Sequence, residues 1–358
     1  MEFAPHARGS GDPFMAEMVD TAERLLIPLH VMFEITMRCN IRCAHCFNFD
    51  RNAPRAVPPA ELSAEEIHDL IDQVRDAGAL FVSFTGGEAM LHPRLGEFVR
   101  HARRRHCVVN VKSNGTLLDA AAVARLVDAG VHHLDVSAYG ARPETHDGFT
   151  GIPGSLERTL RGVRHAKDAG LGVKLNYTLL RTNADEIGEM IALAVSLGVI
   201  CNIDAHVTRR HDGTGKADPR DLRVDRATLE RLYRGPLASL TPGPLPSEQT
   251  FQCACARSNC AIASSGDVYP CIAAPMPCGN VRRARFADIW RNSPQFAWIR
   301  GLTREDFPTC RACPHRAFCA RVSGTVYSST GDYTGAEPFT CMEAEVVHAL
   351  HDERPGEP

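Results

Sequence analysis

The chain has 358 residues, of which 44% are hydrophobic and 23% charged, the balance of a soluble globular protein. Its net charge of -3 gives no reason to expect nucleic acid or an anionic membrane as a partner. No run is apolar enough to span a bilayer, and the first residues hold no signal-peptide core, so a cytoplasmic location is expected.

Residues 1–27 are polar, apart from a short helical stretch at 15–26, and are predicted to form an N-terminal tail that is too short to fold as a leader-peptide-binding domain. A strand–loop–helix pattern then repeats from residue 28 to residue 207. Strands are predicted at 30–36, 79–84, 107–112, 132–137, 172–178 and 199–205. Helices are predicted at 63–77, 92–105, 119–129, 155–169 and 184–197, and Ser63 and Glu66 form a capping box for the first.

Six strands that alternate with helices imply an α/β fold with a parallel sheet and right-handed crossovers. Six units are fewer than the eight of a closed barrel. Residues 208–250 break the pattern and are predicted to be a linker with one helix at 225–233, or alternatively a loop that covers the substrate. Its basic cluster, Arg209-Arg210-His211, is expected to be solvated surface. Residues 251–345 form a cysteine-rich region, and 346–358 a charged C-terminal tail.

Cysteine is abundant, with 14 residues. In a reducing compartment this number indicates metal or cluster ligation rather than disulfides. Three cysteines lie within residues 39–46 and nine lie between residues 253 and 341. Only Cys107 and Cys201 stand alone, in apolar runs, where they are expected to be buried core thiols.

The first cysteine motif, Cys39-x3-Cys43-x2-Cys46, follows the first predicted strand. Three thiolates within eight residues can bind three irons of a cubane cluster, for which four cysteines are the usual full set. One iron then stays open, as one position does in a catalytic metal site. The alternatives are buried thiols or a zinc site, but zinc motifs usually use paired Cys-x2-Cys units.

This motif, in this place, resembles the radical S-adenosylmethionine (SAM) superfamily. The resemblance implies a 4Fe-4S cluster whose open iron chelates the amino and carboxylate groups of SAM. It also implies that residues 28–207 form a partial (β/α)6 TIM-like barrel, open on one side for substrate. His45 takes the place of an aromatic residue near the adenine in this family and is expected to pack there rather than to bind iron.

The second predicted strand leads into Thr85-Gly86-Gly87-Glu88. Glycines let the backbone approach a ligand closely, and a carboxylate beside them can accept a hydrogen bond from an ammonium group. The stretch resembles the family's Gly-Gly-Glu motif, which implies that Gly86, Gly87 and Glu88 bind the amino group of SAM.

Polar residues also end the next three predicted strands. The resemblance makes Ser113, Asn114, Ser137 and Asn176 candidate contacts to SAM, because barrel sites gather at the carboxyl ends of strands. An ordinary structural role is the alternative for each of them. Tyr139 departs from the Ser-x-Asp-Gly form common in this family and is a candidate to face the substrate.

The cysteine-rich region has the pattern Cys253-x12-Gly266-x4-Cys271, followed by Cys310-x2-Cys313-x5-Cys319 and a closing Cys341. It resembles the SPASM domain, an extension that holds one or two auxiliary iron–sulfur clusters, with a zinc ribbon as the alternative. The resemblance implies a complete ligand set for the second auxiliary cluster: Cys310, Cys313, Cys319 and Cys341.

The first auxiliary cluster is where the sequence departs from this family. A cysteine normally follows Cys319 within a few positions, but here Val322 and Ser323 occupy these places. Five candidate ligands remain: Cys253, Cys255, Cys260, Cys271 and Cys278. A cluster is still expected, with Cys278 or Cys260 as the replacement ligand; the alternatives are an open iron or a two-iron cluster.

The two resemblances together imply an enzyme that cleaves SAM to a 5′-deoxyadenosyl radical and removes a hydrogen atom from substrate carbon. The cysteine-rich region resembles maturases of ribosomally made peptides, which implies oxidative modification of a precursor peptide by a C–C or thioether crosslink. Oxidation or decarboxylation of a small molecule in haem or antibiotic biosynthesis is the alternative. A flavodoxin- or ferredoxin-type reductant is expected, and a separate leader-peptide-binding protein is a candidate partner. A non-catalytic electron carrier is disfavoured because it would need no Gly-Gly-Glu motif.

Overall fold

A computed structural model describes residues 13–52, 60–213, 215, 217–240, 244 and 253–353 of the chain. Within these residues the strands form one nine-stranded sheet in the order β6-β5-β4-β3-β2-β1-β7-β8-β9. The first six strands are β1 (His30–Thr36), β2 (Phe81–Gly86), β3 (Val108–Ser113), β4 (His133–Ala138), β5 (Gly172–Thr178) and β6 (Ile200–Asp204). All five pairings among these six strands are parallel, and the sheet does not close on itself, which confirms the predicted partial barrel.

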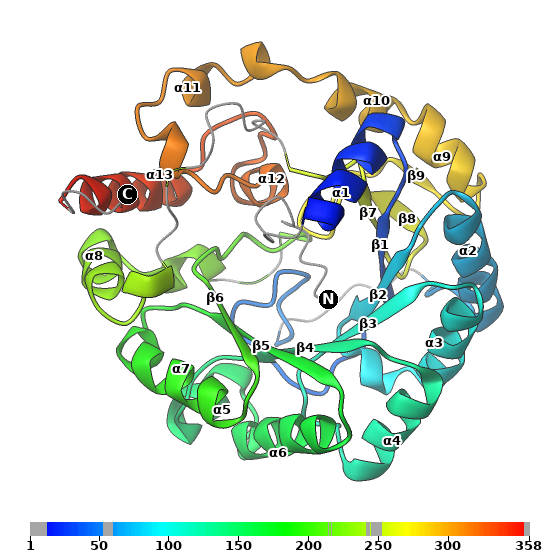
Figure 1. The fold of residues 1–358 in the computed structure, drawn as a ribbon, viewed down its shortest axis with the longest axis horizontal. Coiled ribbons are helices and arrows are strands. Elements are labelled where there is room, and N and C mark those ends of the chain that lie inside the picture. The colour runs from blue at the N-terminus through cyan, green and yellow to red at the C-terminus, as the bar shows by residue number, and fades with distance from the viewer. Residues whose placement is uncertain are drawn as a thin grey trace.

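Helices surround this sheet in an outer ring (Figure 1). The barrel helices are α2 (Ala64–Asp76), α3 (Leu95–Arg104), α4 (Ala120–Ala129), α5 (Pro143–Thr150), α6 (Ser155–Asp168) and α7 (Ile187–Ser196). The predicted capping box begins α2, where the Ser63 hydroxyl accepts from the Glu66 amide and the Glu66 carboxylate accepts from the Ser63 amide. Helix α5, which the sequence did not predict, lies between β4 and α6.

Alternate residues on each strand face the helices or the inside of the barrel. On β1, the buried Val31, Phe33 and Ile35 belong to the main apolar core that the strands share with the outer helices. The other face of β1 carries His30, Glu34 and Thr36, all of which are also buried. The barrel interior is therefore lined with polar groups, whereas the stabilising apolar core lies between the sheet and the helix ring.

The cysteine-rich part of the chain continues the barrel sheet. Strand β7 (Asn259–Ile262) pairs in parallel with β1, with Val31 opposite Cys260. Strands β8 (Asp267–Tyr269) and β9 (Gly279–Asn280) then add antiparallel. The sequence predicted none of these three strands, so the sheet is larger than the six strands expected.

Seven further α-helices are described outside the barrel units: α1 (Pro13–Leu25), α8 (Arg226–Arg234), α9 (Phe286–Asn292), α10 (Pro294–Gly301), α11 (Pro308–Arg311), α12 (Ser323–Thr330) and α13 (Pro338–Asp352). Helix α13 packs against α8 and buries Val346, Val347 and Leu350. The predicted boundary at residue 345 therefore cuts through a packed helix, and only residues 354–358 of the predicted tail lie outside the described part. Residues 1–12 and most of 241–252 are outside it as well. None of the described helices is long and apolar enough to cross a membrane.

Candidate functional site

The loop that carries Cys39, Cys43 and Cys46 follows the carboxyl end of β1, and all three cysteines are half-buried. Its backbone is held from two sides. The Arg42 amide donates to the Thr150 carbonyl (2.7 Å), so α5 supports the loop from one side. Within the loop, the Cys46 amide donates to the Cys43 carbonyl (3.1 Å), which brings these two residues close together.

The other support is the pair Gly86-Gly87 at the end of β2. The Gly87 amide donates to the Thr36 carbonyl (2.7 Å), and the Glu88 amide donates to the Arg38 carbonyl (2.8 Å). A Cβ atom on either glycine would overlap these carbonyl oxygens, and Gly86 has a φ of +137° that favours glycine. The two glycines thus let β2 touch the backbone directly before Cys39.

Glu88 joins the ends of β2 and β3. Its carboxylate is fully buried and accepts three hydrogen bonds: from the Met90 amide (3.0 Å), the Ser113 hydroxyl (2.8 Å) and the Asn114 amide (2.7 Å). Burial raises the pKa of Glu88, and these three donors oppose that rise. A carboxylate has about four acceptor positions, so room for one further donor remains.

Asn114 connects β3 to the cysteine loop. Its side-chain amide donates to the side-chain oxygen Oδ1 of Asn40 (2.9 Å) and lies 4.0 Å from Cys39 Sγ. Thr116 completes this network by accepting from the Asn40 side chain (2.8 Å). The structure therefore gathers Cys39, Glu88, Ser113 and Asn114 at one end of the sheet. Asn40 was missed by the sequence analysis because nothing in its local pattern sets it apart.

The remaining predicted SAM contacts lie on β4 and β5. Ser137 lies opposite Asn176 in the sheet, and the Asn176 amide donates to Asp135 (3.3 Å). Asp135 also pairs with Lys112 (2.9 Å) and Lys174 (3.1 Å). Burial acts to raise the pKa of Asp135, but the two lysines lower it well below its usual range. The barrel interior therefore contains a charged network next to the predicted site.

His45 and Tyr139 belong to one aromatic cluster. The His45 ring lies 5.1 Å from Tyr139 and 5.0 Å from Phe149, measured between ring centroids. Burial lowers the pKa of His45 to about 4, so this ring is neutral at pH 7. His45 therefore packs against neighbouring rings, as predicted. Tyr139 is buried among these rings, with its hydroxyl near Cys43, and its substrate-facing role stays a prediction.

The chemistry of the three loop thiols suits iron. Burial raises the pKa of Cys39, and it raises the pKa of Cys43 to about 12, so free thiolates are disfavoured there without a nearby cation. A bound cluster would supply that positive charge through its irons. Cysteine binds metal as the thiolate, so cluster binding and deprotonation would occur together. Among the described residues no three His, Cys, Asp or Glu side chains surround a single ion position. Cluster ligands need no such shared point, since each thiolate binds a different iron.

A second group of thiols lies beside the amino end of α12. Cys253 Sγ and Cys255 Sγ are 3.1 Å apart, and a Cβ on Gly324 would lie 2.6 Å from Cys271 Sγ. Hydrogen bonding from the Cys255 thiol lowers the pKa of Cys253, and the amides of Ser323 and Gly324 assist. Ser323 is one of the two positions at which the family's missing cysteine was expected, so α12 here offers backbone donors instead of a ligand.

The other predicted cluster ligands divide into two sets. Cys260 and Cys278 are buried in the apolar core, and Cys278 Sγ lies 3.4 Å from the Met276 carbonyl. Cys341 lies close enough to Cys310, Cys313 and Cys319 for their charges to raise its pKa, which burial and these charges bring to about 11. The last four cysteines therefore lie within electrostatic reach of Cys341, and their ligation of a second auxiliary cluster stays a prediction.

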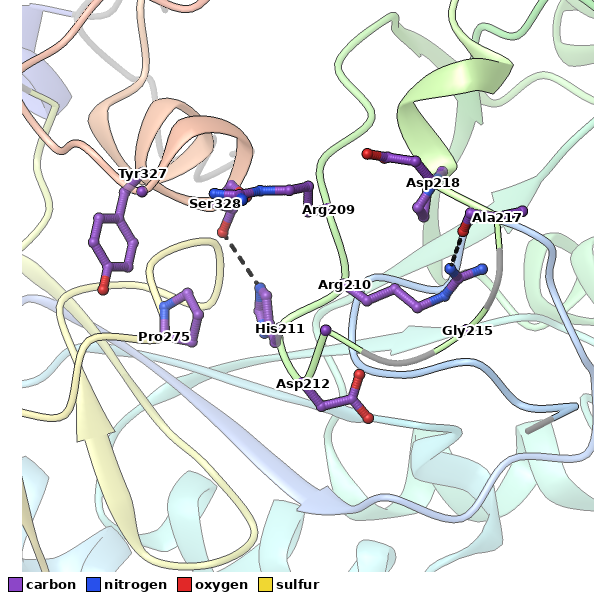
Figure 2. Close-up of a pocket in the computed structure, with 13 residues that line it drawn as sticks. Arg209, Arg210, His211, Asp212, Gly215, Ala217, Asp218, Pro275, Tyr327 and Ser328 are labelled. Atoms are coloured by element: carbon purple, nitrogen blue, oxygen red, sulfur yellow. Dashed lines mark hydrogen bonds between the residues drawn. The ribbon is translucent and has the colours of Figure 1, made fainter. Parts of the chain in front are cut away.

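A cavity of about 620 Å³ lies between the β6–α8 connection (residues 205–225, of which 214 and 216 are not described) and α12 (Figure 2). Arg209, Arg210 and His211 line it, together with Tyr327 and Ser328. The predicted solvated basic cluster is thus one wall of a cavity. The cavity forms between segments that are far apart in the chain, so the local sequence pattern could not predict that the basic cluster lines it.

Comparisons with known proteins agree with this arrangement. Residues 33–194 match the family model of the radical SAM superfamily, and residues 253–314 match SPASM, an iron–sulfur cluster-binding domain. The chain is 30% identical to an AdoMet-dependent heme synthase of Methanosarcina barkeri, over 87% of this chain and 96% of that protein. It is 28% identical to a PqqA peptide cyclase of Granulibacter bethesdensis, over 91% of this chain and 90% of that protein.

Solved structures are also similar to this chain in fold. The crystal structure of Streptococcus suis SuiB bound to S-adenosylmethionine superimposes with a TM-score of 0.67 at 17% identity, and the match covers 92% of this chain and 81% of that one. Radical SAM enzymes use a 4Fe-4S cluster and SAM, and the SPASM match adds auxiliary iron–sulfur clusters. This chain therefore belongs to the radical SAM superfamily and is an enzyme with a C-terminal SPASM domain.

Proposed function

We propose that this enzyme reductively cleaves SAM and oxidatively modifies a peptide, forming a C–C or thioether crosslink. The reduced cluster with SAM supplies a 5′-deoxyadenosyl radical, which removes hydrogen from an unactivated carbon. Cys39, Cys43 and Cys46 are the proposed cluster ligands, and Glu88, Ser113 and Asn114 the proposed SAM contacts. Similarity to PqqA peptide cyclases over most of the chain supports a peptide substrate.

A second candidate substrate is a small molecule that is oxidised or decarboxylated. The identity of 30% to an AdoMet-dependent heme synthase, over 96% of that protein, favours this candidate. Both candidates use the same radical chemistry and differ only in what occupies the substrate site.

One observation carries the proposal: the three-cysteine loop is fixed between α5 and the Gly86-Gly87 turn, with Asn114 beside Cys39. A fixed loop would hold the cluster and its ligand in one geometry, which radical chemistry requires because the reactive species must meet only one carbon.

The decisive experiment is anaerobic reconstitution followed by incubation with SAM and dithionite or a flavodoxin-type reductant. We expect 5′-deoxyadenosine from the native enzyme and none from the variant in which Cys39, Cys43 and Cys46 are Ala. A Cys201→Ala variant is the matched control, because this thiol lies outside both cysteine groups, and it should keep the activity. Undiminished 5′-deoxyadenosine from the triple variant would disprove the assignment.

Mass spectrometry after turnover separates the two substrate candidates. Short peptides encoded beside the gene and coexpressed with the enzyme should lose hydrogen if they are crosslinked. Carboxylated small molecules should instead lose hydrogen or carbon dioxide. Modification of a small molecule, with every neighbouring peptide unchanged, would replace the first candidate by the second.

A further inference from the structure

One wall of the cavity between the β6–α8 connection and α12 is hydrogen-bonded to the segment that carries the three-cysteine loop. Arg210 Nη2 donates to the Ala44 carbonyl (3.0 Å), and the His211 amide donates to the Phe47 carbonyl (2.7 Å). The rings of Phe47 and His211 also meet, with 5.1 Å between their centroids. One wall of the cavity is therefore bonded to the segment around Cys43 and Cys46.

The opposite wall belongs to the cysteine-rich half of the chain. Arg209 Nε donates to the Ser328 carbonyl (3.3 Å), and the Ser328 hydroxyl donates to the Ala273 carbonyl. Ala273 follows Cys271 by two positions, and α12, which contributes Ser328, begins beside the Cys271 sulfur. The two walls of the cavity are thus hydrogen-bonded to the segments that carry the two groups of cysteines.

Arg209 is the cation on the cavity wall that could hold an anion. Its side chain is exposed and lines the cavity, and its Nε donates to the Ser328 carbonyl. Asp218, a carboxylate in the wall, pairs with Arg220 at 2.6 Å and also lies within electrostatic reach of Arg209. Burial lowers the pKa of His211 to about 4, so its ring is neutral. Asp212 lies apart from Arg209, beyond His211 (Figure 2).

We propose that this cavity binds the substrate of the enzyme through a carboxylate group that Arg209 holds. An arginine fork matches a carboxylate with two parallel hydrogen bonds, and the volume of about 620 Å³ is in the range of small-ligand sites. The inference rests on the proposed function, because it identifies the occupant as the substrate. A peptide would present an acidic side chain, and a small molecule its own carboxylate.

Binding to matched acidic and neutral probes tests this. The full-length protein, reconstituted and loaded with SAM but without reductant, is titrated by calorimetry. The peptide arm compares acetyl-Glu-Tyr-Glu-amide with acetyl-Gln-Tyr-Gln-amide. The small-molecule arm compares protoporphyrin IX with its dimethyl ester. We expect the acidic member of at least one pair to bind about tenfold more tightly or better, and the arm that discriminates identifies the source of the carboxylate.

Variants test whether Arg209 causes the preference for the acidic probe. Arg209→Gln should remove the preference for the acidic probe, whereas Arg209→Lys, which keeps the charge, should retain most of it. Arg291→Gln makes the same change of charge on α9, outside the cavity wall, and should bind like the native protein. Iron content and circular dichroism show that each variant is folded. Equal binding of acid and neutral forms in both arms, or a preference that survives Arg209→Gln, would overturn the proposal.

This test can fail separately from the proposed function. Binding is measured without reductant and without turnover, so a lost preference leaves the 5′-deoxyadenosine result intact. Conversely, an enzyme that fails to cleave SAM while it binds the acidic probe would disprove the proposed function and keep the carboxylate site.

Discussion

The side chain of Glu88 connects the ends of β2 and β3 and lies in the predicted SAM site. Its three internal donors come from the turn after β2 and from the end of β3. The sequence identified Glu88 by its place after two glycines. It did not indicate the bonds to Ser113 and Asn114, because these depend on strand pairing between residues far apart in the chain.

The Glu88→Gln variant should bind SAM roughly tenfold or more weakly, since losing a hydrogen bond to a charged group costs about 1.5–3 kcal/mol. It should also unfold more easily, because the new NH₂ group cannot accept from the internal donors. Iron content should stay unchanged. Equilibrium SAM binding measures the effect, with Glu97→Gln on the exposed face of α3 as control. An unaltered dissociation constant together with lower stability would assign Glu88 a structural role only.

At the scale of elements, the β6–α8 connection is more than a linker. Arg223 pairs with Glu337 at 2.7 Å; the Glu337 side chain is buried, and that of Arg223 is mostly buried. Arg223 also donates to the Val207 carbonyl and to the Ser329 hydroxyl (3.1 Å). The connection is therefore tied to α12 and to the start of α13 through one guanidinium group.

Replacing Arg223 by Met should destabilise the protein by about 3–5 kcal/mol, because it leaves the Glu337 carboxylate buried without its cation. Arg226→Met is the comparison, since Arg226 pairs with Glu345 near the surface and should cost at most about 1 kcal/mol. The free energy of unfolding from urea titration decides between them. Similar losses in both variants would contradict a special role for the buried pair.

The elements show what local pattern can and cannot predict. Strands β1 to β6 were predicted to within about two residues, because each is an apolar run before a helical repeat. Strand β7 has only four residues, and Cys260 within it looked like a ligand rather than a strand residue. Its strand conformation comes from pairing with β1, which no local window contains. Helix α5 was missed because its eight residues carry little apolar periodicity.

In the molecule as a whole, the auxiliary cysteines form two groups, and the buried side chain of Arg321 lies near both. Arg321 donates to Ser323 (2.6 Å) and to the Tyr333 carbonyl (2.7 Å). Burial lowers the pKa of Arg321, while the nearby thiols of Cys310 and Cys253 act to raise it. Arg321 thus lies within electrostatic reach of both groups. The contact of Cys255 with Cys253 makes Cys255 a stronger ligand candidate than the sequence suggested.

Protein that lacks Cys39, Cys43 and Cys46 should still bind iron for two clusters, about eight atoms if both are four-iron cubanes. Adding Cys271→Ser should lower this to about four, because one ligand of the first auxiliary cluster is lost. Cys201→Ser in the same background is the control and should change nothing. Iron analysis and Mössbauer spectroscopy measure both quantities. About four atoms, unaffected by Cys271→Ser, would show that only the second auxiliary cluster forms.

The pairing of β7 with β1 also sets an order for biosynthesis. A ribosome releases β1 early, but the partner for its second edge emerges only with residues 259–262. Until then β1 presents unpaired backbone groups of the kind that promote association between nascent chains. The three-cysteine loop follows β1 directly, so the barrel that holds it is completed only after most of the polypeptide has been made. Cluster insertion at that loop would accordingly be favoured late, once both halves of the chain have met.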